Sequence, residues 1–235
     1  LPTSRRFLPL PVAAMSAHPA APAASQDPAA FWNRRYAAPA YAYGTAPNAF
    51  FSQQLADLPA GRLLLPAEGE GRNAAHAARM GWQVAAFDLS EQGRRKALAL
   101  AAAFGVADRL AYQVGSVQDM PLPPGQFDAA ALVFAHFAPA IKSASHRKVA
   151  QALAAGGHLI FEGYAKSNLP RVRANPAIGG PQDEQALFSL DEIRADFIDG
   201  AGLEPLVLQE TVVQLHEGQF HNGAASVIRF VGRKP

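Results

Sequence analysis

LLLPAEGEGRNAAHAARMGW, residues 63–82, carries the strongest indication of the fold in this chain. Three leucines run into a proline, and Gly69 and Gly71 then flank a glutamate ahead of an alanine-rich run. A short continuous apolar run is typical of a buried strand, and the alanine-rich run is typical of a helix. Glycines at the junction let the backbone turn tightly and approach a ligand with no Cβ in the way. The stretch therefore predicts a strand, a ligand-binding turn, and a helix whose free N–H groups point at the ligand.

The same alternation of short apolar runs and helical patterns continues along the chain. Strands are expected at 62–66, 83–88, 110–115, within 127–137 and at 158–165, and helices at 72–80, 90–105 and 140–154. Strands that alternate with helices indicate right-handed crossovers and a parallel sheet covered on both faces.

Two further strand-like runs close the chain, at 203–215 and 220–232. The HEGQ segment between them is too short for a crossover, so these two strands should be antiparallel. The predicted fold class is α/β: a Rossmann-like, doubly wound, seven-stranded sheet, mostly parallel, with a C-terminal antiparallel hairpin strand. Ligands of such sheets bind beyond the carboxyl ends of the strands, where the strand order reverses.

Residues 28–235 are expected to form a single domain. Asp27 and Pro28 have the pattern of a helix start, and the segment 28–58 is predicted to be an N-terminal helical lid. Residues 1–27 are rich in proline and alanine and show no period, which predicts a disordered tail or an upstream extension. Translation could start at Leu1 or at Met15.

Composition excludes several classes of function. The 235 residues are 49% hydrophobic and 17% charged, with no cysteine, so disulfides, thiolate zinc sites and a cysteine nucleophile are ruled out. No apolar run has the length of a membrane helix, and prolines break the apolar stretch near the N-terminus, which favours a cytoplasmic protein over an exported one. The net charge of +2 comes with no basic stripe, so no nucleic-acid partner is expected. No histidine pair has metal-binding spacing, so no metal site is predicted.

An acid after the second predicted strand points to an adenosine-bearing cofactor. Asp88 follows Gly71 by 17 positions, and a carboxylate there can accept hydrogen bonds from both hydroxyls of a ribose. Ala74 stands where the phosphate-binding fingerprint G-x-G-x-x-G needs its third glycine. The pattern therefore favours an adenosine cofactor other than a dinucleotide.

At these motifs the chain resembles the class I S-adenosylmethionine-dependent methyltransferases, over roughly residues 28–235. LLLPAEGEGRNA and VAAFDLSEQGRRKA are similar to the first and second motifs of that class, and VGSVQDMPLP is similar to its adenine-flanking segment. QFDAAALVFAHF and ALAAGGHLIFEGY are similar to its fourth and fifth strands. Within the class, GEGRNA, the WNRRY…YGTAPN opening and EGQFHNGAASVIR resemble the tellurite-resistance and thiopurine methyltransferase-like bacterial group.

The resemblance implies S-adenosyl-L-methionine as cofactor and a set of residues that bind it. The expected cofactor-binding residues are Glu68, Gly69, Glu70, Gly71, Asp88, Leu89, Ser116, Val117 and Phe134. Leu65 and Ala67 depart from the family pattern, which has an acid and a glycine at these two positions. Glu68 could replace the missing acid. Ser116 stands where the family usually has an aspartate.

The expected activity is methyl transfer to a small-molecule nucleophile, with sulfur, selenium and tellurium compounds suggested by the resemblance. His136 follows the fourth strand and is the predicted catalytic base or substrate binder, with a purely structural histidine as the alternative. The substrate and lid candidates are Trp32, Tyr36, Tyr43, Arg171 and His221. The pattern leaves the acceptor and the oligomeric state open.

Two other functions compete with this interpretation. A non-catalytic S-adenosylmethionine- or nucleotide-binding protein on the same fold would explain the apolar residue at Leu65. An NAD(P)-dependent oxidoreductase would need the phosphate fingerprint and a tyrosine followed four residues later by a lysine. Tyr36, Tyr41 and Tyr164 are followed at that spacing by alanine, threonine and asparagine.

Overall fold

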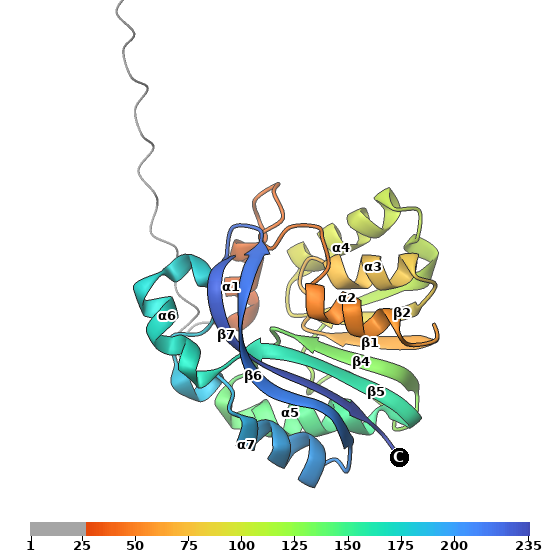
Figure 1. The fold of residues 1–235 in the computed structure, drawn as a ribbon. Coiled ribbons are helices and arrows are strands. Elements are labelled where there is room, and N and C mark those ends of the chain that lie inside the picture. The colour runs from red at the N-terminus through yellow and green to blue at the C-terminus, as the bar shows by residue number, and fades with distance from the viewer. Residues whose placement is uncertain (1–26) are drawn as a thin grey trace, which may run out of the picture.

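The computed structural model describes residues 27–235 and contains one seven-stranded sheet in the order β3-β2-β1-β4-β5-β7-β6 (Figure 1). The strands are β1 Arg62–Pro66, β2 Gln83–Asp88, β3 Leu110–Val114, β4 Phe127–Val133, β5 Leu153–Tyr164, β6 Glu204–Glu217 and β7 His221–Arg233. Strands β1 to β5 pair in parallel, and β7 is antiparallel to both β5 and β6. The predicted fold class, with its C-terminal hairpin, is confirmed. The predicted tail lies outside the described residues except for Asp27.

Helices cover both faces of the sheet. They are α1 Pro28–Arg35, α2 Ala49–Ala56, α3 Arg72–Arg79, α4 Glu91–Ala103, α5 Pro139–Gln151, α6 Leu169–Ala174 and α7 Leu190–Ile193, which continues as a π-helix at Arg194–Asp199. Figure 1 shows α2, α3 and α4 over one face and α5 and α7 over the other. Within residues 27–235 no helix is both long and apolar enough to cross a membrane.

Side-chain caps set several helix starts. Asp27 accepts a hydrogen bond from Ala29 N, and Asn48 accepts one from Phe51 N at the start of α2. Ser189 and Glu192 form the reciprocal capping box of α7. Because these side chains satisfy N–H groups that the helix leaves unpaired, the sequence specifies where each helix begins.

One predicted boundary is wrong. The helical pattern predicted a helix to residue 154 and a strand from 158, but α5 ends at Gln151 and β5 begins at Leu153. Leu153 is fully buried and pairs with Phe127 of β4. Pairing within the sheet overrides the alanine-rich helical pattern, because a buried strand residue must find partners for its backbone groups.

The strand order reverses at β1. From β1 the chain continues to β2 and β3 on one side, and β4 and β5 lie on the other side. The turn at residues 67–71 leaves the carboxyl end of β1 at this place. Buried clusters on both faces of the sheet, one around Phe161 and one around Leu65, fix the strands beneath the turn. The fold thus positions the glycine turn where ligands of doubly wound sheets bind.

Candidate active site

The glycine turn has left-handed backbone at both glycines, with φ of 62° at Gly69 and 83° at Gly71. A Cβ at Gly71 would lie 2.3 Å from the Cβ of Ala97 on α4, and a Cβ at Gly69 would lie 2.7 Å from the hydroxyl of Tyr36. Tyr112 donates a hydrogen bond of 2.6 Å to the carbonyl of Gly69. Both glycines are therefore needed for close approach, Gly71 to a helix of the chain itself and Gly69 to the side chain that covers the turn.

Ala67 takes the same left-handed conformation without being a glycine, at φ 52°. This conformation costs an L-residue about 1–2 kcal/mol because the Cβ crowds the following carbonyl. Ala67→Gly is therefore expected to raise the unfolding midpoint by about 2–4 °C. Calorimetry checks this. Ala60→Gly, in the loop before β1, is the control for the added backbone freedom, and equal midpoints in the two variants would contradict the expected relief of strain.

Asp88, at the end of β2, is tied to the glycine turn. Its Oδ2 accepts a hydrogen bond of 3.1 Å from Gly69 N, and its Oδ1 accepts one of 2.9 Å from Ser90 N. Burial raises the pKa of Asp88 to about 6, although these backbone N–H donors oppose the shift. Each carboxylate oxygen has a second lone pair, so Asp88 can still accept hydroxyl groups of a ligand.

Glu68 is the acid that follows β1, while Leu65 at the family's acidic position is buried in the core. The Oε1 of Glu68 accepts a hydrogen bond of 2.7 Å from Ala74 N, and the Oε2 of Glu68 accepts one of 3.4 Å from the side-chain amide of Asn73. Glu68 thereby caps the first turn of α3. Burial raises the pKa of Glu68 to about 7, against the lowering effect of these donors.

The raised pKa of Glu68 has a consequence for stability. Between its ordinary pKa of 4.5 and about 7, the folded state binds a proton that the unfolded chain has released. Glu68 therefore lowers the free energy of unfolding as pH rises through this range. Buried His136 and His221, whose pKa values are lowered, act in the opposite direction.

Comparison with Glu68→Gln isolates the contribution of Glu68, because the histidines are common to both proteins. Between pH 5 and pH 8 the wild-type protein should lose a few kcal/mol of stability relative to the variant. Denaturant titrations at the two pH values measure this. Equal pH dependence in the two proteins would show that Glu68 is ionised throughout.

Other predicted cofactor residues bind the chain itself. The buried carboxylate of Glu70 accepts hydrogen bonds from Ala42 N at 2.7 Å and from Lys96 Nζ at 2.6 Å. Glu70 thus fastens the N-terminal segment to α4. Ser116 donates to Asp119 at 2.6 Å, and Asp119 is an acid of this loop that the sequence interpretation missed. Val117 is buried in the core cluster beneath the loop, and Leu89 is partly buried directly after β2.

A second group of residues, the His221 cluster, lies where the hairpin meets the N-terminal segment. We define it as His221 with the three rings that surround it, Tyr43, Phe134 and Tyr164. Their centroids lie 4.4, 4.5 and 5.5 Å from that of His221. Phe134 directly follows β4 with φ of 51°. The fold thus brings together Tyr43, Phe134 and His221, which the sequence predicted as separate candidates.

Glu217, which the sequence places with His221 as a candidate in the HEG turn, completes a buried dyad with His221. His221 Nδ1 lies 3.0 Å from Glu217 Oε2. Arg72 Nη2 lies 2.8 Å from the same carboxylate oxygen, and the side-chain amide of Asn48 donates to Oε1 at 3.0 Å. Glu217 and His221 are four residues apart across the hairpin turn, which is the signal that could have paired them.

The charges of the dyad follow from these contacts. Burial alone would raise the pKa of Glu217, but the hydrogen bond from His221 and the charge of Arg72 bring it down to about 2. Burial lowers the pKa of His221, against the effect of Glu217. The lowered pKa of His221 favours its neutral form, and the carboxylate of Glu217 favours the tautomer that donates from Nδ1. Within residues 27–235 no hydrogen-bond partner meets Nε2, so its lone pair is available to accept a proton.

The lid candidates divide between two places. Trp32 stacks on Tyr36 at 5.5 Å between centroids, and Tyr36 contacts Tyr43 edge-on at 6.4 Å. These rings connect the glycine turn with the His221 cluster. Arg171 lies on α6 and donates a hydrogen bond of 3.0 Å to Ser226 Oγ of β7.

His136, the predicted base, is held by the main chain through both ring nitrogens. Nδ1 lies 2.9 Å from the carbonyl of Ala186, and Nε2 accepts a hydrogen bond of 3.4 Å from Tyr164 N. Burial lowers the pKa of His136 to about 4. In this conformation neither nitrogen is available for a substrate proton, and the side chain fastens the loop before α7 to β5.

Comparisons with known proteins relate the chain to a protein family and to several solved structures. Residues 66–157 match the family model described as a methyltransferase domain. A search of curated proteins finds no significant sequence match. A similar solved structure, associated with conversion of a disulfide bond into a thioacetal group during echinomycin biosynthesis, has 18% identity and a TM-score of 0.69, and the match covers 88% of this chain and 92% of that one.

Two further structures share the fold. The 4+2 cyclase SpnF has 19% identity and a TM-score of 0.63, covering 94% of this chain and 99% of that one. A protein from Methanosarcina mazei described as a SAM-dependent methyltransferase has 14% identity and a TM-score of 0.61, covering 75% of this chain and 94% of that one. The domain match runs from the end of β1 into β5 and includes the glycine turn and Asp88. Residues 66–157 thus match a methyltransferase domain, and the chain has the fold of a protein described as a SAM-dependent methyltransferase.

Proposed function

We propose that this protein is a methyltransferase that takes S-adenosylmethionine as its cofactor and transfers the methyl group to a small-molecule nucleophile bound against the His221 cluster. The observation that carries the proposal is the buried dyad of His221 and Glu217 beside Phe134, at the same edge of the sheet as the glycine turn. Such a dyad fixes the imidazole tautomer and leaves one nitrogen to accept a proton.

The residues around the glycine turn fit the cofactor chemically. Glu68 and Asp88 supply carboxylates for its ammonium and its ribose hydroxyls, and the backbone at Gly69 is free of a Cβ. The N–H groups at the start of α3 suit its carboxylate. When bound, the cofactor supplies an activated methyl group on a sulfonium. The protein must align the acceptor and exclude water.

His221 is the proposed general base. Glu217 orients the ring, and Arg72 with Asn48 holds Glu217 in place. When the cofactor supplies its methyl group to the acceptor's nucleophilic atom and keeps the electron pair of the broken C–S bond on sulfur, the acceptor's proton would pass to His221 Nε2. The proton then leaves to water. Removal of the proton matters most for an acceptor that is protonated at the working pH.

The proposed acceptors are sulfur, selenium or tellurium compounds, as in the tellurite-resistance and thiopurine methyltransferase-like group. The sequence segments GEGRNA and EGQFHNGAASVIR support this assignment, and the second contains His221. Sulfur is also the reacting element in the solved structure associated with thioacetal formation. The aromatic rings around His221 suit a soft, weakly hydrated acceptor.

We also propose that the segment 28–58 acts as a lid. Gln219 N at the hairpin tip donates to the carbonyl of Ala42 at 3.0 Å, and Asn48 binds both Glu162 and Glu217. Opening this segment would expose the dyad. The contacts support a site that closes around its ligands from the hairpin and the N-terminal side together.

Thermal unfolding with S-adenosylmethionine, S-adenosylhomocysteine and NAD tests the cofactor. A ligand at 100 times its dissociation constant stabilises the fold by about 2.7 kcal/mol, so the midpoint should rise by a few degrees with the two S-adenosyl compounds and stay unchanged with NAD. Radiolabelled methyl transfer to thiols, selenite and tellurite then identifies the acceptor class. Binding of S-adenosylmethionine without transfer to any of these would favour a non-methylating role, such as the cyclase chemistry named for SpnF.

A further inference from the structure

We propose that two lysines of α5 act as separate positioning residues, Lys148 for the cofactor-binding loop and Lys142 for the loop beside the His221 cluster. The inference rests on the proposed function, because it assigns one loop to the cofactor and the other to the acceptor. Each lysine holds its loop through the carbonyls of that loop.

Lys148 holds the loop after β3. Its Nζ donates hydrogen bonds of 2.8 Å to the carbonyl of Val117 and 2.9 Å to that of Gln118. A small cavity of about 130 Å³ lies between this segment and α5. Charge-assisted hydrogen bonds to two consecutive carbonyls fix the path of the segment where packing alone leaves space. This is the segment predicted to flank the adenine.

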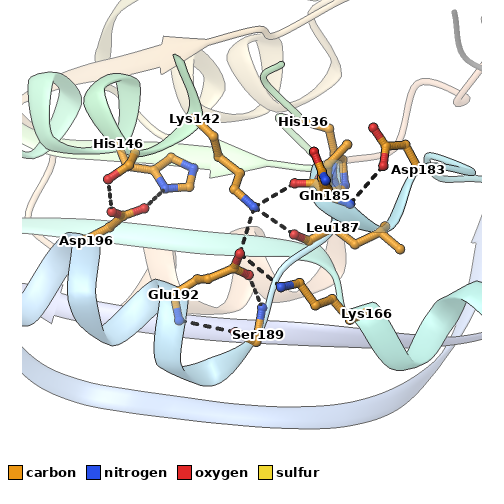
Figure 2. Close-up of polar contacts among 12 residues, drawn as sticks. His136, Lys142, His146, Lys166, Asp183, Gln185, Leu187, Ser189, Glu192 and Asp196 are labelled. Atoms are coloured by element: carbon orange, nitrogen blue, oxygen red, sulfur yellow. Dashed lines mark hydrogen bonds and ion pairs between the residues drawn. The ribbon is translucent and has the colours of Figure 1, made fainter. Parts of the chain in front are cut away.

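Lys142 holds the loop before α7 (Figure 2). Its Nζ donates hydrogen bonds of 2.9 Å to the carbonyls of Gln185 and Leu187, and it lies 3.2 Å from Glu192 Oε1. The side chain is buried. His136 binds the intervening carbonyl, that of Ala186. Three consecutive carbonyls are thus held by side chains of the β4–α5 region.

The same loop contacts the proposed catalytic dyad upstream of these anchors. Tyr164 donates a hydrogen bond of 2.7 Å to the carbonyl of Ile178. A Cβ at Gly179 would lie 2.9 Å from His221 Cδ2, so the loop backbone packs directly on the imidazole. Release of the loop at residues 185–187 would therefore loosen the wall beside His221, and the glycine turn would remain in place.

The experiment compares Lys148→Met with Lys142→Met, and each variant is the control for the other. Lys148→Met should raise the dissociation constant for S-adenosylmethionine about tenfold, as loss of a charge-assisted hydrogen bond predicts. Hydrogen exchange should speed up in residues 115–120. Lys142→Met should leave that constant within twofold and speed up exchange in residues 183–189. Calorimetry and mass spectrometry measure the two readouts.

Two more variants separate positioning from general stability. Lys166 and Lys142 both bind the carboxylate of Glu192. Within residues 27–235 the ammonium of Lys166 binds no loop carbonyl. Lys166→Met should therefore leave hydrogen exchange in residues 183–189 unchanged. Lys142→Arg keeps the charge and should show a smaller effect in the same segment if Lys142→Met does not fold. Equal shifts in cofactor affinity for Lys142→Met and Lys148→Met, or unchanged affinity in Lys148→Met, would overturn the inference. Wild-type protein that binds no S-adenosylmethionine would overturn the cofactor assignment as well.

Discussion

His221→Ala is expected to lower the rate of methyl transfer about a hundredfold or more while the affinity for S-adenosylmethionine stays within twofold of wild type. A general base contributes about 10²–10⁴-fold to a rate, and His221 is separated from the glycine turn by the rings of Tyr36 and Tyr43. Single-turnover rates and calorimetry of cofactor binding measure the two quantities. A larger loss of cofactor affinity than of rate would contradict a role for His221 as base.

Glu217→Gln should produce a smaller loss in the same direction, because an amide cannot hold the imidazole in the same tautomer. His136→Ala tests the competing assignment, since it removes the other candidate imidazole, whose nitrogens bind Ala186 and Tyr164. If His136→Ala loses the greater part of the rate and His221→Ala keeps it, the base is His136, as the sequence predicted. The loss in His221→Ala should be smallest for acceptors that are already ionised at the assay pH.

Asp88→Ala is expected to weaken binding of S-adenosylmethionine by about one to two orders of magnitude. The carboxylate has two functions here. It is the predicted partner of the ribose hydroxyls, and it holds the turn through Gly69 N at 3.1 Å. Asp88→Asn keeps the shape but sets an amide N–H against a backbone N–H, so it should also weaken binding. Calorimetric titration measures both variants.

Asp128→Ala is the matched control for this result. Asp128 also accepts a backbone hydrogen bond, of 2.7 Å from Arg62 N, but it does so at the amino end of β1, away from the carboxyl edge of the sheet. Its loss should leave cofactor affinity unchanged. Unchanged affinity in Asp88→Ala as well would refute the ribose role of Asp88.

Local patterns along the chain were sufficient to predict the architecture. The strands at 62–66 and 83–88 lie where the apolar runs predicted them, and α1 starts at Pro28 with Asp27 as its cap. Periodicity and caps act over a few residues and depend little on the rest of the fold. Where tertiary pairing competes, as at Leu153, the pattern by itself predicted the wrong boundary.

The contact between the glycine turn and Asp88 could also be predicted from the chain, because Gly69, Gly71 and Asp88 belong to two adjacent strand ends. Local patterns were thus enough to predict the fold class, the glycine turn and the acid beside it. The His221 cluster and its dyad depend on long-range contacts that no local pattern encodes. The hairpin carries His221 and Glu217 to Arg72 and Asn48, more than a hundred residues away in the chain, and it closes three rings around the imidazole. The tertiary structure also turned His136 toward the main chain, because a buried imidazole must satisfy its own nitrogens where the fold offers partners.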